Sequence, residues 1–322
     1  MIRSWYIKIS SAILCVLCLT AIITGCQVNE NQNTAINYSY TDHSFERNGV
    51  KLHLDCIEAA NKKPQKQILL THGVTYSSHE FDIDYEDYSL VRFLVSEGYA
   101  VWRLDIAGFG QSGEVKDGFM PDSDYAADDI SAAVDNIIST VGKNKIDLLG
   151  WSWGTVTASR YIKKSSEHIN KLVLYAPILS GIGKGEVNEA FHHNTWEHAA
   201  DDFQHNESGD YDLSITDPVM INMFCSSCWR YDKEHSPNGG RKDLCVDKSK
   251  ELIDLSAIKV QTLIICGSND PYLNYDLINT AQKKLPEGSQ TKVISGGAHV
   301  IMYEKPYYHE FQKELKDFLT KN

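Results

Sequence analysis

Basic residues are in the minority in this chain of 322 residues. It has 31 Lys and Arg against 43 Asp and Glu, which gives a formal net charge of −12 at pH 7. Proteins that bind nucleic acid carry a basic face that neutralises phosphates, so this composition argues against nucleic acid as a partner. We also find no internal repeat, so the chain is not an array of repeated units. Its length suits one large α/β domain with room for an inserted lobe.

Acidic residues are absent from the first 25 positions. These positions carry Arg3 and Lys8, and an apolar run then extends from Ile9 to Ile23. That arrangement is typical of a secretory signal peptide. A transmembrane anchor is the alternative, but the run is shorter than the roughly 20 apolar residues that span a bilayer. We therefore predict that residues 1–25 are a signal peptide.

The apolar run ends in the letters ITGC, which resemble the lipobox of bacterial lipoproteins. The resemblance implies that Cys26 is lipidated and becomes the new amino terminus. The mature protein would then be extracytoplasmic and anchored to a bacterial membrane through its lipid. Loss of Arg3 and Lys8 would change the formal charge from −12 to −14. Residues 26–37 are polar and rich in Asn, and we expect a flexible tether there.

Few cysteines remain once the signal peptide is removed. Two of the eight lie within it and a third is the expected lipid site, which leaves Cys56, Cys225, Cys228, Cys245 and Cys266. An odd number in an exported protein leaves at least one thiol unpaired within the chain. Cys266 lies in the apolar run TLIICG, where we expect a buried thiol. Disulfides are favoured outside the cytoplasm, so we predict a bond from Cys245 to Cys228, with Cys225 as the alternative partner.

Two clusters offer side chains that could bind a metal. One is the set of three cysteines just described, and the other contains His192, His193, His198 and His205 beside several acids. The cysteine cluster lacks a clear fourth ligand, and a structural zinc site needs four. The histidines suit a polar face of the inserted lobe that partly borders the substrate. We therefore expect no metal.

Strand and helix patterns alternate along most of the chain. Residues 38–47 and 49–58 suggest an antiparallel pair of strands, and apolar runs such as KQILLT (66–71) indicate buried strands. Amphipathic stripes typical of helices lie between such runs, for example in residues 124–142. This alternation predicts a mostly parallel, twisted sheet with helices on both faces.

The alternation stops between residues 179 and 258, where the sequence is polar and rich in His, Trp and Tyr. After this segment, strand and helix patterns resume. We predict an α/β core formed by residues 38–178 and 259–322, with a mainly helical lid inserted at residues 179–258.

The letters GWSWG at residues 150–154 place one serine between two tryptophans and two glycines. The pattern Gly-x-Ser-x-Gly is typical of a sharp turn that presents a serine nucleophile, but it is short enough to arise by chance. Here a predicted strand precedes the pattern and a predicted helix follows it, so Ser152 falls on the turn. Gly150 and Gly154 lack the Cβ atoms that would crowd such a turn, and the tryptophans can pack sideways.

A serine hydroxyl is a weak nucleophile that needs a base to take its proton and an acid to orient the base. Asp270 follows the apolar run TLIICG, and His299 follows KVISGG. Each comes just after a predicted strand, where open parallel sheets place their sites. We therefore predict a catalytic triad of Ser152, His299 and Asp270. Of the other histidines, His72 is expected to support its loop, and His309 lies in the last predicted helix.

The order Ser, Asp, His at strand ends resembles that of the α/β-hydrolases across residues 40–322. The resemblance also rests on the motifs THGV (71–74), DIAGFGQSG (105–113), GSNDP (267–271) and GGAHVIMYEKP (296–306). It implies the α/β-hydrolase fold, with an oxyanion hole formed by the backbone N–H groups of Val74 and Trp153. Some members of this superfamily use an Asp nucleophile, which we disfavour because the turn holds a serine. Asp105 is expected to support the turn after its strand.

The resemblance implies a serine hydrolase that forms a covalent acyl-enzyme and needs no cofactor. We predict that its substrate is a small carboxylic ester. One alternative is a peptidase resembling the proline iminopeptidases, which would cleave an amide and need an acidic anchor in the lid, such as Glu186, Glu189 or Glu197. Another is a non-catalytic surface protein that binds a ligand on a hydrolase scaffold, although binding alone gives no reason to retain a triad. The sequence predicts neither the exact substrate nor the oligomeric state.

Overall fold

The computed structural model of the protein describes residues 36–232 and 234–321. The predicted signal peptide, the expected lipid site at Cys26 and most of the predicted tether lie outside these residues. Within them, none of the helices combines the length and the apolar character that a membrane crossing requires.

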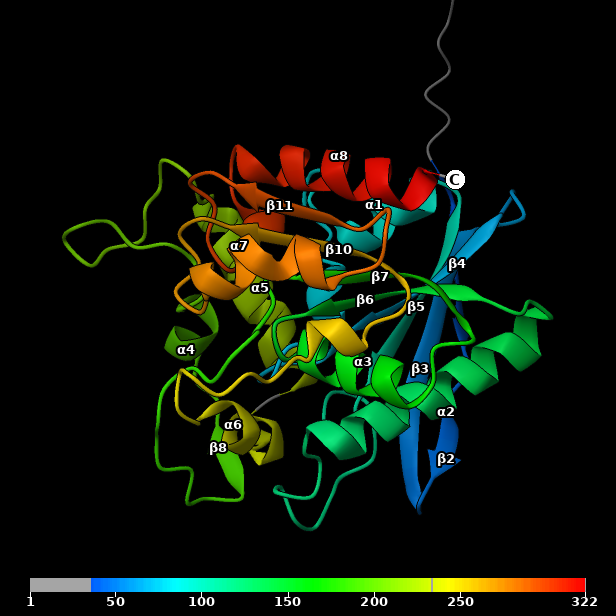
Figure 1. Cartoon of the computed structure of the whole chain (residues 1–322), viewed down its shortest axis with the longest axis horizontal. Helices are drawn as coiled ribbons and strands as arrows, with labels where there is room; N and C mark the ends of the chain where they lie inside the picture. Colours follow the sequence, from blue (N-terminus) through cyan, green and yellow to red (C-terminus); the bar gives the residue numbers. More distant parts are fainter. Residues whose placement is uncertain (1–35, 233, 322) are drawn as a thin grey trace, which may run out of the picture. The chain divides into compact units, whose positions relative to one another are not determined.

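A nine-stranded sheet forms the centre of the described fold (Figure 1). In chain order its strands are β1 (Tyr38–Asp42), β2 (Phe45–Arg47), β3 (Val50–Ala59), β4 (Lys66–Thr71), β5 (Tyr99–Asp105), β6 (Ile146–Trp151), β7 (Ile169–Tyr175), β10 (Gln261–Gly267) and β11 (Gln290–Ile294). Their spatial order is β1, β3, β5, β4, β6, β7, β10, β11, with β2 paired to β3. Pairings among β1, β2, β3 and β5 are antiparallel, and the remaining pairings are parallel. The mostly parallel sheet and the antiparallel pair predicted from the sequence are confirmed.

Two apolar cores cover the two faces of the sheet. Successive residues of a strand point to opposite faces, so in β4 Leu69 belongs to one core while Ile68 and Leu70 belong to the other. The first face is covered by α2 (Ser123–Val141), α3 (Trp153–Lys164) and α7 (Tyr275–Lys284), and the second by α1 (Leu90–Ser96) and α8 (Tyr307–Thr320) (Figure 1). The prediction of helices on both faces is therefore confirmed.

The ends of α2 follow directly from its sequence. The Asp122 side chain accepts hydrogen bonds from the backbone N–H groups of Asp124 at 3.0 Å and Tyr125 at 2.8 Å, which caps the first turn. Gly142 ends the helix with φ 63°, in the left-handed region that glycine adopts without strain. The amphipathic stripe between these two caps thus forms the helix that its pattern predicts.

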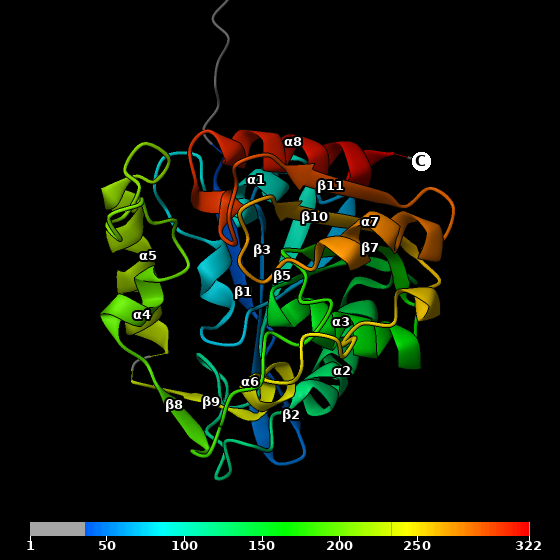
Figure 2. The same ribbon diagram turned by 60° about the vertical axis from the view of Figure 1, so that its left-hand side comes forward.

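The segment between β7 and β10 forms a group of short elements at one side of the sheet (Figure 2). They are β8 (Phe191–His193), α4 (Trp196–Ala200), α5 (Pro218–Tyr231), β9 (His235–Pro237), α6 (Gly239–Leu244) and the short 3-10 helix η2 (Leu255–Ala257). Strands β8 and β9 pair with each other in an antiparallel ribbon, which the sequence did not predict. Three residues per strand are too few to show an alternating pattern. We call residues 179–258 the lid.

The predicted disulfide between Cys245 and Cys228, or alternatively Cys225, is wrong. All five described cysteines have free thiols. Cys225 and Cys228 lie on the buried face of α5 and join the core that α1 and α8 cover. Cys245 instead follows α6 and lines a cavity elsewhere in the fold. The prediction relied on distance along the chain, whereas the direction of the side chains decides whether two cysteines can be bridged. Cys266 is buried, as expected.

Candidate active site

Ser152 lies on the turn between β6 and α3, at the carboxyl end of a central strand. Its backbone has φ 55° and ψ −120°, a conformation that costs a non-glycine residue about 1–3 kcal/mol. Such strain persists only where the surrounding structure enforces it. Ser152 lines a cavity of about 210 Å³, so the strained turn presents its side chain to a space that a small molecule can enter.

Two glycines permit this turn because backbone atoms occupy the places where their side chains would be. A Cβ on Gly150 would lie 2.2 Å from the carbonyl oxygen of Gly154. A Cβ on Gly154 would lie 2.3 Å from the carbonyl oxygen of Thr71. Both distances are far shorter than van der Waals contact, and backbone atoms cannot move aside as a flexible side chain can. Helix α3 therefore begins in direct contact with β6 and β4.

The two tryptophans beside Ser152 enter opposite cores of the sheet. Trp151 stacks on Tyr175 in the core covered by α1 and α8, with ring centroids 5.8 Å apart. Trp153 lies in the other core, and its Nε1 donates to the hydroxyl of Ser123 at 2.8 Å. The large side chains therefore fill the two faces of the sheet, and neither covers the serine hydroxyl.

His299 and Asp270 meet where the loops after β11 and β10 lie side by side. His299 Nδ1 is 2.9 Å from Asp270 Oδ2, and Asp270 Oδ1 accepts from the N–H of Tyr272 at 2.9 Å. The carbonyl oxygen of His299 accepts from Trp151 Nε1 at 3.2 Å and from the Tyr175 hydroxyl at 3.1 Å. These contacts hold His299 in place both through its imidazole ring and through its backbone carbonyl.

The three residues of the predicted triad are brought together in this structure. Ser152 and His299 line the same cavity, and the carboxyl group of Asp270 lies within hydrogen-bonding distance of His299 Nδ1. No hydrogen bond joins Ser152 to His299 in the described part of the chain, and such contacts commonly tighten only when substrate binds. Burial by itself lowers the pKa of His299, but the negative charge of Asp270 and the hydrogen bond to it outweigh burial and raise this pKa above 6.5.

The loop after β4 carries Val74, one of the two predicted oxyanion donors. His72 shapes this loop, because its Nδ1–H donates to the Gly73 carbonyl at 2.7 Å and its Nε2 accepts from the Ile106 N–H at 3.1 Å. Val74 lines the cavity. Trp153, the other predicted donor, is the first residue of α3, where a backbone N–H has no acceptor within the helix. The expected supporting role of His72 agrees with these contacts.

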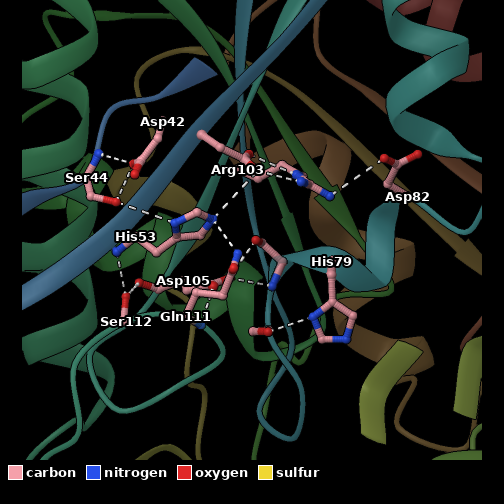
Figure 3. A network of polar contacts seen from close by, with 12 residues as sticks. Asp42, Ser44, His53, His79, Asp82, Arg103, Asp105, Gln111 and Ser112 are labelled. Carbon is pink, nitrogen blue, oxygen red and sulfur yellow. Dashed lines mark hydrogen bonds and ion pairs between the residues drawn. The ribbon is translucent and has the colours of Figure 1, made fainter. Parts of the chain in front are cut away.

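A buried polar network fastens the loop after β4 to the neighbouring strands (Figure 3). The carboxylate of Asp105, at the end of β5, accepts from the backbone N–H groups of Ser78 and Gln111, both at 2.9 Å. Beside it, Arg103 Nη1 lies 3.8 Å from Asp82. Asp105 therefore supports the turns around it, as expected, and is not among the residues that line the cavity.

The lid joins this network through Asp232, directly after α5. Its carboxyl group accepts hydrogen bonds from the backbone N–H groups of Ser77 at 3.1 Å and Gly110 at 3.0 Å. Burial, together with the nearby charge of Asp105, raises the pKa of Asp232 to about 8. One buried carboxyl of the lid thus bridges the loops that follow β4 and β5.

Sequence reasoning missed several polar residues of the cavity. Those without a predicted role include Glu80, Asp201, Asp202, Arg241 and Tyr272. Glu80 accepts from the Gly73 N–H at 2.8 Å, and burial raises its pKa well above the usual range. No motif marks these positions, because the folding of the lid and of the loops after β4 and β10 brings them to the cavity. The acidic lid residues named from the sequence, Glu186, Glu189 and Glu197, are exposed and do not line it.

Histidines of the lid border the cavity only in part. His198 lines it, and its Nδ1 lies 3.4 Å from His192 Nε2. Across residues 36–232 and 234–321, no group of three or more His, Cys, Asp or Glu side chains is arranged to hold a metal ion. His309 is remote from the cavity and pairs with Asp87 at 3.0 Å on the surface.

Known proteins resemble this chain over most of its length. Residues 62–306 match the hydrolase family described as serine aminopeptidase, S33. A putative non-heme chloroperoxidase of Synechocystis sp. is 26% identical over 245 residues, which cover 73% of this chain and 84% of that relative.

Solved structures share the fold. A bromoperoxidase from Bacillus anthracis has a TM-score of 0.62 at 20% identity, covering 88% of this chain and 100% of that one. An esterase from Exiguobacterium antarcticum has a TM-score of 0.60 at 18% identity, covering 85% and 97%. The family match and these structures confirm the α/β-hydrolase fold that the sequence motifs implied.

The contact at Gly154 predicts a stability effect. Gly154→Ala forces a methyl group against the Thr71 carbonyl, and overpacking of this kind costs about 1–3 kcal/mol. Urea unfolding should show the loss as a lower midpoint. Gly185→Ala is the control, since the nearest atom to its Cβ would be 3.7 Å away. Equal midpoints for the two variants would contradict the close approach of α3 to β4.

Proposed function

We propose that this protein hydrolyses carboxylic esters through Ser152, since the chain belongs to the family described as serine aminopeptidase, S33, and its cavity has the groups this chemistry needs. One observation carries the proposal. A serine on a strained turn shares a cavity with a histidine whose other ring nitrogen is 2.9 Å from a buried aspartate. This is the arrangement of nucleophile, base and orienting acid that acyl transfer requires.

In the proposed mechanism, Asp270 fixes the tautomer of His299. The carboxylate accepts a hydrogen bond from Nδ1–H, so the proton stays on Nδ1 and Nε2 is left as the basic nitrogen. Nε2 removes the proton of the Ser152 hydroxyl as the oxygen attacks the ester carbonyl. The same nitrogen then protonates the departing alcohol, and the acyl group remains on the serine. Water, activated by His299 in turn, releases the acid.

The oxyanion of each tetrahedral intermediate is proposed to lie between the N–H groups of Val74 and Trp153. Two observations support this assignment. Val74 lies in the loop that His72 holds in place, and Trp153 begins a helix whose first N–H groups have no intrahelical partner. Donors fixed in advance stabilise developing charge without reorganising, and removing one such donor typically costs about 3–4 kcal/mol of barrier.

A peptidase is the second candidate, and Asp202 is the observation that favours it. Asp202 belongs to the lid, is half-buried and lines the cavity beside His299. Its carboxyl group accepts no hydrogen bond from any described residue, so it is available to the ammonium group of an aminoacyl substrate. Asp202 replaces the exposed glutamates that the sequence suggested for this role. We favour an ester because its carbonyl is less stabilised by resonance than that of an amide and its alcohol is the better leaving group.

Labelling and turnover test the nucleophile. Ser152→Ala should abolish hydrolysis of p-nitrophenyl esters and covalent labelling by a fluorophosphonate, because only the attacking oxygen is removed. Ser208→Ala, at an exposed position, is the matched control and should keep both. Aminoacyl p-nitroanilides assayed beside the esters separate the two candidate functions. Labelling of the Ser152→Ala variant would place the nucleophile at another residue.

The pH profile tests the base. Only neutral His299 can accept the serine proton, so kcat/KM should rise with pH through a pKa above 6.5. Asp270→Asn removes the negative charge that raises this pKa, so the acid limb should move to lower pH and the rate should fall on the order of 10,000-fold. Asp276→Asn, at an exposed position, is the control. An acid limb that stays in place in Asp270→Asn would show that another group titrates.

We also propose that the enzyme is exported and attached to a membrane through lipid on Cys26. The support is the sequence alone, namely the apolar run and the ITGC ending. One acyl chain gives only marginal membrane binding, so firm attachment implies more than one chain on the new amino terminus.

Fractionation tests the lipid anchor. The mature protein should sediment with membranes and require detergent for release. Cys26→Ser should free the protein or leave the precursor uncleaved, whereas Cys18→Ser, within the predicted signal peptide, should change neither. Mass spectrometry that finds an unmodified Cys26 on the mature chain would refute the proposal.

A further inference from the structure

We propose that Arg241 binds a carboxylate of the substrate, so that the enzyme prefers esters that carry a second, free acid group. The inference rests on the proposed ester hydrolysis and names the substrate class for that site. It starts from a guanidinium in the cavity that has no acidic partner.

Arg241 belongs to α6 of the lid and lines the cavity of the triad. Its Nη2 donates to the Thr75 hydroxyl at 2.7 Å. Its Nη1 lies 3.2 Å from the side-chain oxygen of Asn238 and 3.4 Å from the hydroxyl of Ser236. All three acceptors are neutral, and they leave some of the five N–H donors of the guanidinium unused. Thr75 directly follows Val74, so the positive charge lies next to the proposed oxyanion loop.

Arg241 differs from the other arginines that the structure describes because it is withdrawn from solvent and still has no acidic partner. Arg47, Arg92, Arg103 and Arg160 each form an ion pair with at least one aspartate, and Arg230 is exposed to solvent. Arg241 is half-buried and takes part in no ion pair of the described residues. Burial lowers its pKa to about 10, which still leaves the group positive at neutral pH. A cation withdrawn from water without a counter-ion is costly, and a bound anion would remove that cost.

The acids of the cavity do not neutralise this charge by direct contact. Burial raises the pKa of Glu80 well above its usual range and also raises that of Asp202, so the cavity disfavours their charged forms. Asp201 is exposed. Nearby His198 has a pKa that burial lowers, so it adds no second positive charge at neutral pH. The guanidinium is therefore the fixed positive charge of the cavity.

Helix α6 holds Arg241 in a fixed position relative to Ser152. A Cβ on Gly240 would lie 2.6 Å from the Trp153 ring, so the helix rests directly on the residue after the serine. Asp243, two residues after Arg241, accepts from the Ser123 N–H at 2.9 Å and pairs with Arg160 at 3.3 Å. A guanidinium held this way can take a carboxylate through two parallel hydrogen bonds, with no further ordering of the lid.

Matched pairs of substrates test the inference. Monoethyl esters of succinate, glutarate and adipate place a carboxylate on the acyl side at increasing distance, and O-acetyl glycolate places it on the alcohol side. Each is compared with its neutral carboxamide analogue by titrating the acid released. Hydrogen bonds to charged groups predict that kcat/KM for at least one acid exceeds that of its amide by about 10–100-fold.

Variants assign the preference to Arg241. Arg241→Gln should remove the preference by lowering kcat/KM for the acid while changing the amide by less than about threefold. Arg241→Lys should restore part of it, because the charge returns without the two-pronged geometry. Lys242→Gln, which removes the same charge from the next residue of α6, should leave the preference intact. A purely structural role for Arg241 would lower acid and amide equally, and that result would overturn the inference, as would a wild-type enzyme without preference.

A binding measurement separates this inference from the proposed function. Calorimetry with glutarate is carried out on the Ser152→Ala protein and on the same protein with Arg241→Gln added. If no ester is cleaved, the proposed function fails, and Arg241-dependent binding of glutarate still supports the anion site. If neutral esters are cleaved but acids are neither preferred nor bound, the proposed function stands and this inference is wrong.

Discussion

The steric contact where α3 begins determines the positions of the nucleophile and of the proposed oxyanion donors. Because Gly150 and Gly154 have no side chains, the Gly154 carbonyl of the helix lies against Gly150 of β6, and Gly154 itself lies against the Thr71 carbonyl of β4. That closeness forces Ser152 into its left-handed conformation and leaves the N–H of Trp153 at the free start of the helix. The loop after β4 lies beside the same point, since the Gly154 Cβ position is occupied by Thr71 backbone. Nucleophile and proposed oxyanion donors therefore share one packing constraint.

The core and the lid contribute different chemistry to the cavity. The core supplies Ser152, His299 and Asp270 from the loops after β6, β11 and β10, and these groups suit bond making and breaking. The lid supplies the Arg241 guanidinium and the Asp202 carboxyl group, which suit recognition of a substrate. A parallel sheet can place reactive residues at one edge whatever lies above it. The lid can then change its charges without disturbing the reactive groups.

The structure of the core follows from sequence patterns more directly than that of the lid, for a physical reason. Strands β4, β6 and β10 are mostly apolar runs with a glycine at or near the carboxyl end. The ends of these strands, and with them the positions of Ser152 and Asp270, were therefore predictable from the sequence pattern alone. The lid has no such period. Its three-residue strands are too short to alternate visibly, and Arg241 reaches the cavity only because Gly240 lets α6 rest on an indole. The wrong disulfide has the same origin, since the inward turn of Cys228 depends on the packing of α5.

The carboxyl group of Asp232 has a consequence for how such a lid could be exchanged between related proteins. It satisfies backbone donors in two separate core loops, at Ser77 and Gly110. A chimaera that received a foreign lid without an equivalent acid would leave the buried Ser77 N–H and the half-buried Gly110 N–H without this acceptor. An unsatisfied buried donor costs about 1–3 kcal/mol. Natural recombination and laboratory grafting face the same restriction. The lid is an insertion in the linear chain, but a replacement lid must still supply a hydrogen-bond acceptor for the core loops that it contacts.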